Sequence, residues 1–159
     1  MYGTTREEVR DFLAQKRLAL VGVSRNPKDF SREMFRELRR QGYDMVPVNP
    51  AVDEVDGERS FARLQDIKPP VDGVLVMTPA DQSLRIAQDC EESGITHVWF
   101  HRGTGRGAVD EEAVGFCRER GMHVVAGLCP YMFLSQAPFF HRVHGFFMKV
   151  AGTYPPKAA

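Results

Sequence analysis

"LALVGVSRNPKDFS", residues 18–31, begins with an apolar run that ends at Gly22 and continues into a short polar loop. The run predicts a strand that is buried on both faces. The next segment, "REMFRELRRQG" (32–42), has apolar residues at helical spacing, with Ser31 as the predicted N-cap and Gly42 as the C′ residue. A buried strand that leads through a tight loop into a helix is the building unit of a parallel α/β sheet.

The same unit recurs along the chain. Apolar segments at 43–50, 71–79, 96–101 and 123–127 predict further strands, and the segments at 82–93 and 110–121 predict helices between them. Short connections between such units require parallel strands with right-handed crossovers. We therefore predict an α/β fold, a Rossmann-like, doubly wound parallel sheet of about five strands in a single domain.

The remaining segments are less regular. A short amphipathic helix is predicted over about residues 5–15, with Thr4 or Thr5 as its N-cap. Residues 51–70 show only a short helical pattern near 61–65. Residues 1–130 form the predicted Rossmann-like domain. Residues 131–159, rich in Phe, form a predicted extension that packs on this domain or on a second copy, so a homo-oligomer is one expectation.

Composition excludes several classes of partner. Lys and Arg total 21 in the 159 residues, and Asp and Glu also total 21, so no net charge attracts nucleic acid or a membrane surface. Cys90, Cys117 and Cys129 lack the close pairing of zinc or redox motifs. With no signal peptide or long apolar span, they predict a cytoplasmic protein.

In a doubly wound sheet, ligands bind beyond the carboxyl ends of the strands, where the strand order reverses. The loop after the first strand combines Gly22, which permits a tight turn, with the hydroxyl and amide donors of Ser24, Asn26 and Ser31. Arg25, Lys28 and Arg32 add positive charge, as does the N-terminal end of the following helix. This combination suits a phosphate. The alternative is that the polar residues only cap and turn the chain while the cations stay solvated.

The common phosphate-binding fingerprints do not match this loop. A dinucleotide loop has three glycines and an acidic residue after the second strand. Here Ser24 and Pro27 occupy the second and third glycine positions, and the second strand ends in "VNP" (48–50). No Gly-Lys-Ser/Thr triplet follows, so a Walker loop is excluded. These departures disfavour NAD without excluding it.

Four segments together resemble a known family: "VGVSRNP" (21–27), "VPVNP" (46–50), "VDGVLVMTP" (71–79) and "CP" (129–130). They are similar to the coenzyme A-binding domain family, small proteins that resemble the amino-terminal domain of the succinyl-CoA synthetase α subunit. The resemblance covers about residues 15–130. The segment "WFHRGTGRG" (99–107) departs from the Trp-Leu-Gln-x-Gly pattern common in this family.

The resemblance implies a binding site for coenzyme A (CoA) or an acyl-CoA. It places the ligand's phosphates on the first loop, its nucleotide beside the end of the second strand, and the other wall of the site after the third strand. The implied residues are Gly22, Val23, Ser24, Asn26, Pro27, Lys28, Ser31, Asn49, Pro50, Thr78 and Pro79. Arg102 and Arg106 are further candidates for a phosphate contact, with a solvated loop as the alternative.

No catalytic residue and no metal ligand is predicted. His97 and His123 lie at strand starts and are interpreted as structural. His141 and His144 share a helix spacing that could bind a metal only with a third ligand, which the sequence does not offer. Cys129 lies at the carboxyl end of the fifth strand, where it is either a buried turn residue or a thiol able to form a mixed disulfide with the coenzyme.

Three functions therefore compete. The favoured one is a module that binds CoA without chemistry of its own. The second is an NAD(P)-dependent oxidoreductase that uses the same crevice. The third is an interaction subunit that kept the fold and pairs through "APFFHRVHGFF" (137–147).

Overall fold

The computed structural model describes residues 2–134, and the predicted extension beyond residue 134 lies outside this range. Five strands form one parallel sheet in the order β2-β1-β5-β6-β7, which confirms the predicted Rossmann-like fold. The elements along the chain are α1 (Arg6–Leu13), β1 (Arg17–Val21), α2 (Phe30–Arg40), β2 (Asp44–Val48), β3 (Glu54–Val55), β4 (Glu58–Arg59), β5 (Gly73–Val76), α3 (Ser83–Glu92), β6 (His97–His101), α4 (Glu111–Glu119) and β7 (His123–Leu128), with 3₁₀ turns η1 (Leu64–Asp66), η2 (Ala80–Gln82) and η3 (Pro130–Met132).

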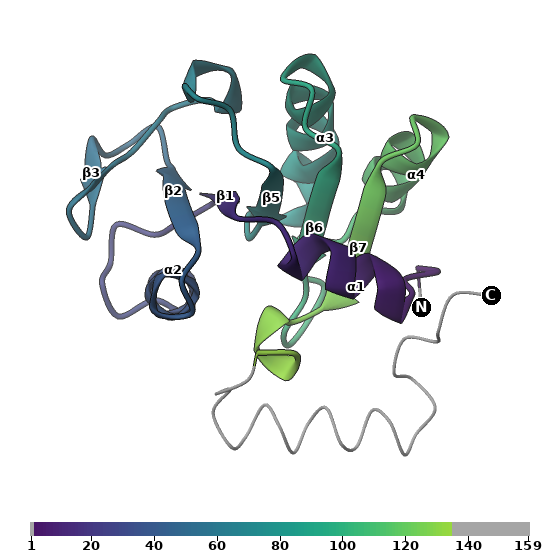
Figure 1. The fold of residues 1–159 in the computed structure, drawn as a ribbon, viewed down its shortest axis with the longest axis horizontal. Coiled ribbons are helices and arrows are strands. Elements are labelled where there is room, and N and C mark those ends of the chain that lie inside the picture. The colour runs from purple at the N-terminus through teal and green to yellow at the C-terminus, as the bar shows by residue number, and fades with distance from the viewer. Residues whose placement is uncertain (1, 135–159) are drawn as a thin grey trace.

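The sheet separates two hydrophobic cores. Leu18 and Leu20 of β1 pack with α1 and α2 on one face, whereas Ala19 and Val21 pack in the core that α3 and α4 cover on the other. Figure 1 shows the two pairs of helices on opposite sides of the sheet. Successive residues of a strand point to opposite faces, so a strand buried on both sides reads as a continuous apolar run.

Local chemistry explains where the elements begin. Thr5 caps α1, and its side chain and that of Glu8 form a reciprocal capping box. Asp110 caps α4 through its carboxylate, as predicted.

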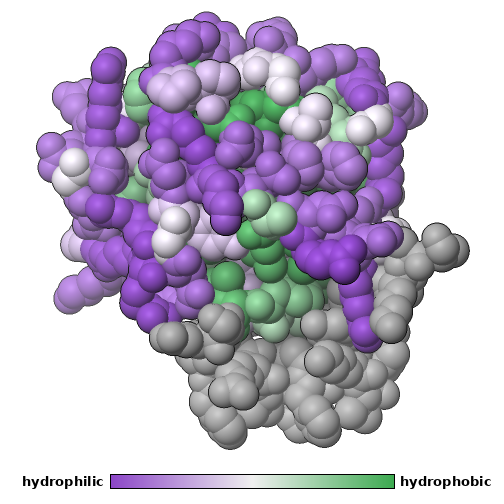
Figure 2. All heavy atoms as spheres, in the orientation of Figure 1, coloured by the Kyte–Doolittle hydropathy of each residue, from purple (hydrophilic) through white to green (hydrophobic). Residues whose placement is uncertain are grey.

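Pro47 is tolerated within β2 because β2 is an edge strand of the sheet. Hydrophilic side chains cover most of the face shown in Figure 2, and hydrophobic residues are visible between them in separate patches in its upper part and its lower centre.

Two expectations about local structure need correction. The N-cap of α2 is Asp29, and Ser31 lies inside the first turn of the helix. The irregular segment after β2 contains an antiparallel hairpin of β3 and β4, and its short helix is the 3₁₀ turn at Leu64–Asp66. Two-residue strands are too short to give a periodic pattern in sequence.

Within residues 2–134, no helix has the length and apolar character needed to cross a membrane.

Candidate functional site

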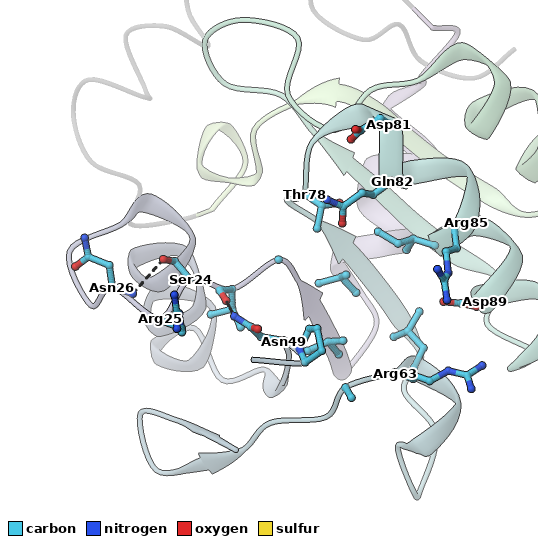
Figure 3. Close-up of a pocket in the computed structure, with 18 residues that line it drawn as sticks. Ser24, Arg25, Asn26, Asn49, Arg63, Thr78, Asp81, Gln82, Arg85 and Asp89 are labelled. Atoms are coloured by element: carbon cyan, nitrogen blue, oxygen red, sulfur yellow. Dashed lines mark hydrogen bonds between the residues drawn. The ribbon is translucent and has the colours of Figure 1, made fainter. Parts of the chain in front are cut away.

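A cavity of about 1060 Å³ opens at the point where the strand order reverses, between the carboxyl ends of β1 and β5. Its walls come from the loops after β1, β2 and β5, from the segment around η1, and from α3. Figure 3 shows Ser24, Arg25 and Asn26 on one side of this first cavity and Arg63, Arg85 and Asp89 on the other. Its location agrees with the general rule for ligand sites in open α/β sheets.

Gly22 brings the loops after β1 and β5 into close approach. Its φ is +96°, and its N–H donates to the carbonyl of Val48 at 3.2 Å. A Cβ atom at this position would lie 2.9 Å from both the Met77 carbonyl carbon and the Thr78 nitrogen. Only glycine fits here without backbone movement. This close approach is the steric reason for the predicted tight turn at Gly22.

The β1–α2 loop is held by its own side chains. The Ser31 hydroxyl accepts from the Ser24 N–H at 2.9 Å, which explains why Ser31 does not cap the helix. The Ser24 hydroxyl oxygen accepts from the Asn26 N–H at 3.1 Å, and the Asn26 side-chain oxygen accepts from the Lys28 N–H at 3.0 Å. These bonds fix the loop without any ligand.

The side-chain donors of Ser24 and Asn26 are already hydrogen-bonded to an acidic residue of the same loop, Asp29. The Asp29 carboxylate accepts from the Ser24 hydroxyl at 2.5 Å and from the Asn26 amide at 3.1 Å, and it makes no capping bond to α2. A phosphate that used the same two donors would have to displace this carboxylate. The sequence left two interpretations open, in which the polar residues of this loop either donate to a phosphate or only cap and turn the chain, and it did not reveal Asp29 as the partner of Ser24 and Asn26.

Two arginines of α2 hold the outer side of the loop. Arg32 donates to the carbonyls of Ser24 and Arg25, each at 3.2 Å, and Arg36 donates to the Pro27 carbonyl at 2.9 Å. Both guanidinium groups also bind the carboxylate of Asp56 in the β3–β4 turn. The pKa of Asp56 lies below its ordinary value, first because Arg32 hydrogen-bonds to it and then because Arg36 does. The hairpin therefore supports the loop.

The segment after β2 offers an amide where a dinucleotide-binding protein has an acid. The Asn49 side chain donates to the Val23 carbonyl at 2.8 Å and accepts from the Ala51 N–H at 2.8 Å. These bonds connect the loops after β1 and β2. Thr78, after β5, has a buried hydroxyl oxygen with no hydrogen-bond partner in the described chain. A buried polar atom without a partner beside a cavity is an available contact for a ligand.

The predicted site residues divide into three groups. Seven line the first cavity: Gly22, Val23, Ser24, Asn26, Asn49, Pro50 and Thr78. Ser31 lines a second cavity described below, whereas Pro27, Lys28 and Pro79 line neither of the two. Ligand contacts of all eleven residues stay predictions.

Three cations line the first cavity, and of these the sequence singled out Arg25 but not Arg63 or Arg85. Nearly every guanidinium in residues 2–134 has a carboxylate, carbonyl, ring or other partner. The exceptions in this range are Arg25, Arg63 and Arg85, and all three line the cavity. Asp81 and Asp89 line it too, and the Asp89 carboxylate accepts from the Gln65 amide at 2.7 Å. Unpaired guanidinium groups around one cavity favour an anionic ligand.

A second cavity, of about 690 Å³, lies on the other side of the glycine and shares Gly22 and Ser24 with the first. Phe30, Met77 and Cys129 contribute apolar or sulfur-containing walls, and the loop after β6 contributes Arg102, Gly103 and Thr104. Arg102 is held by the Gly105 carbonyl at 2.7 Å. The two cavities therefore adjoin at Gly22 and Ser24.

Cys129 is buried in the wall of the second cavity, with 4% of its surface exposed. Burial raises the pKa of its thiol to about 11, although a hydrogen bond from the Tyr131 backbone acts in the opposite direction. Burial also raises the pKa of Cys117 to about 11 and that of Cys90 still further. This environment favours the buried-turn interpretation of Cys129 over the reactive-thiol one.

The Cys129 environment gives a testable expectation. At pH 7 a thiol with a pKa near 11 is roughly 0.01% ionised, so alkylation of Cys129 by iodoacetamide should be far slower than that of a free thiol. Its rate should rise about tenfold per pH unit. Mass spectrometry of tryptic peptides measures this rate, with protein unfolded in guanidinium as the control. Modification of Cys129 by oxidised CoA within minutes at pH 7 would contradict the buried-turn interpretation.

The histidines interpreted as structural lie away from the cavities. His97 and His123 stack at the starts of β6 and β7 with ring centroids 4.5 Å apart. Burial, and then the neighbouring His123, lowers the pKa of His97. Across the described residues, no group of three or more His, Cys, Asp or Glu side chains could hold a metal ion. His141 and His144 lie outside this range.

The five-stranded parallel sheet and the cavity at its switch point define a single-domain, Rossmann-like α/β protein. The chain belongs to the CoA binding domain family, which it matches over residues 16–135. This match confirms the resemblance inferred from the strand-end motifs.

The chain is similar to proteins of two kinds, those that it covers over most of their length and a longer one that it covers only in part. The uncharacterized protein YneT of Bacillus subtilis is 31% identical over 130 residues, covering 81% of this chain and 93% of YneT. A hypothetical protein from Pyrococcus horikoshii has a solved structure with a TM-score of 0.74 and 29% identity, covering 82% of this chain and 89% of that one. The α subunit of the ADP-forming acetate–CoA ligase II of Pyrococcus furiosus is 25% identical over 125 residues, which cover 74% of this chain but 27% of the subunit.

Proposed function

We propose that this protein binds coenzyme A or an acyl-CoA across the two cavities and performs no chemistry of its own. The observation that carries the proposal is the cavity at the sheet's switch point, lined by unpaired guanidinium groups, in a chain of the CoA binding domain family. The close approach at Gly22 and the unpartnered Thr78 hydroxyl both fit a ligand whose diphosphate lies against the loop backbone.

The shape of the site supports an elongated ligand. The nucleotide half fits the first cavity, where Val48, Leu64 and Ile86 supply an apolar wall and Arg25 a cation beside the loop. The thiol-bearing arm fits the second cavity, beside Phe30 and Met77. Such a ligand would pass over Gly22, the residue that both cavities share.

Binding without catalysis is supported by the state of the thiols. Cys129 is buried, and its raised pKa keeps it protonated at neutral pH, so it is a poor nucleophile. The ligase α subunit that this chain resembles is more than three times longer than the matched region, since the match covers 27% of it. Any activity that depends on the rest of such a subunit is outside this proposal.

The dinucleotide alternative finds less support. The loop of this chain departs from the three-glycine fingerprint at Ser24 and Pro27, and the Asn49 amide is already engaged with Val23 and Ala51. A ribose-binding carboxylate is therefore missing at the end of β2.

Equilibrium binding tests the proposal. Isothermal titration calorimetry at one fixed salt concentration should show binding of CoA and acetyl-CoA and weaker binding of NAD and NADP. Arg25→Gln should weaken CoA binding about tenfold, because it removes a charge-assisted contact to phosphate. The matched control is Arg10→Gln, which removes the same charge from α1, a helix that lines neither cavity. Tight binding of NAD or NADP without binding of CoA would overturn the proposal.

A further inference from the structure

Arg63 and Arg85 form a cationic rim at the end of the first cavity opposite the β1–α2 loop. Figure 3 shows both arginines across the cavity from Ser24 and Asn26. Arg63 directly precedes η1, and Arg85 lies on α3. The Gln65 amide donates to Asp89 at 2.7 Å and to Glu92 at 3.0 Å, and these bonds hold η1 against α3. The two arginines therefore come from elements that are fixed to each other.

The two arginines of the rim make no ion pair in the described part of the chain, although Asp81 and Asp89 line the same cavity. Within residues 2–134, neither guanidinium has an ion pair, hydrogen bond or ring contact, whereas most other arginines of this range are engaged. Asp89, the carboxylate on the same helix, accepts from Gln65 instead. Two unpaired guanidinium groups beside one cavity form a site that a dianion would neutralise, and the planar guanidinium matches phosphate oxygens well.

The loop and the rim are separated by the apolar wall of Val48, Leu64 and Ile86. This arrangement suits an adenosine with one phosphate group at each end of the ribose. We propose that Arg63 and Arg85 bind a phosphate monoester on the adenosine ribose of the ligand. This inference rests on the proposed function, which places the diphosphate on the loop. CoA carries such a phosphate at the 3′ position and NADP at the 2′ position, whereas dephospho-CoA, ADP and NAD have none.

Calorimetry with matched ligand pairs tests the rim. The wild-type protein should bind CoA about tenfold more tightly than 3′-dephospho-CoA, because each charge-assisted phosphate contact contributes on that order. In Arg63→Gln and Arg85→Gln this ratio should fall to within about threefold, while affinity for dephospho-CoA stays unchanged. Arg10→Gln is the matched control, because Arg10 lies on α1, on the other face of the sheet. Titrations with NADP and NAD distinguish a 2′-phosphate from a 3′-phosphate.

The outcomes separate this inference from the proposed function. Equal affinity of the wild-type protein for CoA and dephospho-CoA would show that Arg63 and Arg85 do not bind the 3′-phosphate. The proposed function, CoA binding, would not be affected by this result. If both variants still bind CoA about tenfold more tightly than dephospho-CoA, the 3′-phosphate binds elsewhere, and the inference is overturned. If neither compound binds, the proposed function fails and the inference fails with it. The protein could instead prefer NADP over NAD by a larger affinity ratio than CoA over dephospho-CoA. If both substitutions abolish that preference, the rim is a ribose-phosphate site, but for the 2′-phosphate.

Discussion

Gly22→Ala should destabilise the protein and abolish CoA binding. The new Cβ would lie 2.8 Å from the Thr78 side chain and 2.9 Å from two backbone atoms of residues 77 and 78. Backbone atoms of a buried strand end cannot move aside cheaply, and the φ of +96° is itself unfavourable for alanine. We expect the free energy of unfolding to fall by about 3 kcal/mol, a decrease in melting temperature of roughly 6–12 °C.

Gly42→Ala is the matched control for this substitution. Gly42 has a φ of +97°, almost the same as Gly22, but no atom lies within 4 Å of its added Cβ. Its cost should be about 1 kcal/mol, from backbone strain alone. Thermal unfolding of both variants, followed by calorimetry with CoA below their melting temperatures, measures the difference. Equal stability losses would mean that the close approach to Thr78 is unimportant, and full CoA binding by Gly22→Ala would contradict the proposed path of the ligand.

Local patterns were sufficient to predict the main sheet. Leu18–Val21 is apolar throughout because both faces of β1 are covered, and Gly22 ends it where the chain must turn. The β3–β4 hairpin gave no such signal. Its pairing depends on two residues from each strand and on contacts between Asp56 and helix α2, which are far apart in sequence. Asp56 also has a positive φ of 49°, which its neighbours in sequence do not reveal.

The candidate site was predictable only in part. The strand ends that line the first cavity follow from the topology rule, which needs no side-chain detail. Arg63 and Arg85 were not predicted, because an isolated arginine in a polar segment is usually solvated. Their significance depends on which carboxylates the fold gives to the other arginines, and that pairing exists only in three dimensions. The same reason explains why Asp29 was not recognised as the partner of Ser24.

Asp56 connects the hairpin to the β1–α2 loop through Arg32 and Arg36, and its charge should matter for stability. Arg32, which is 8% exposed, depends on Asp56 for its counter-charge while it holds the carbonyls of Ser24 and Arg25. Asp56→Asn keeps the side-chain shape and suits the positive φ, so it removes the charge alone. A nearly buried guanidinium without its carboxylate is unfavourable, and we expect a loss of about 2 kcal/mol in the free energy of unfolding at neutral pH.

The pH dependence of that loss provides the decisive test. The hydrogen bonds from Arg32 and then Arg36 lower the pKa of Asp56 in the folded protein. The stabilisation by this carboxylate is therefore fully present above the unfolded-state pKa of about 3.9 and is lost as the pH falls through the lower, folded-state pKa. Urea unfolding should show a large difference between the wild-type protein and Asp56→Asn at pH 7 that narrows steadily below about pH 4. Asp53→Asn, an exposed acid just before the same hairpin, should change stability by less than about 0.5 kcal/mol. A difference for Asp56→Asn that is independent of pH would show that the carboxylate charge is not the cause of the loss, and the hairpin would then support the loop without that charge.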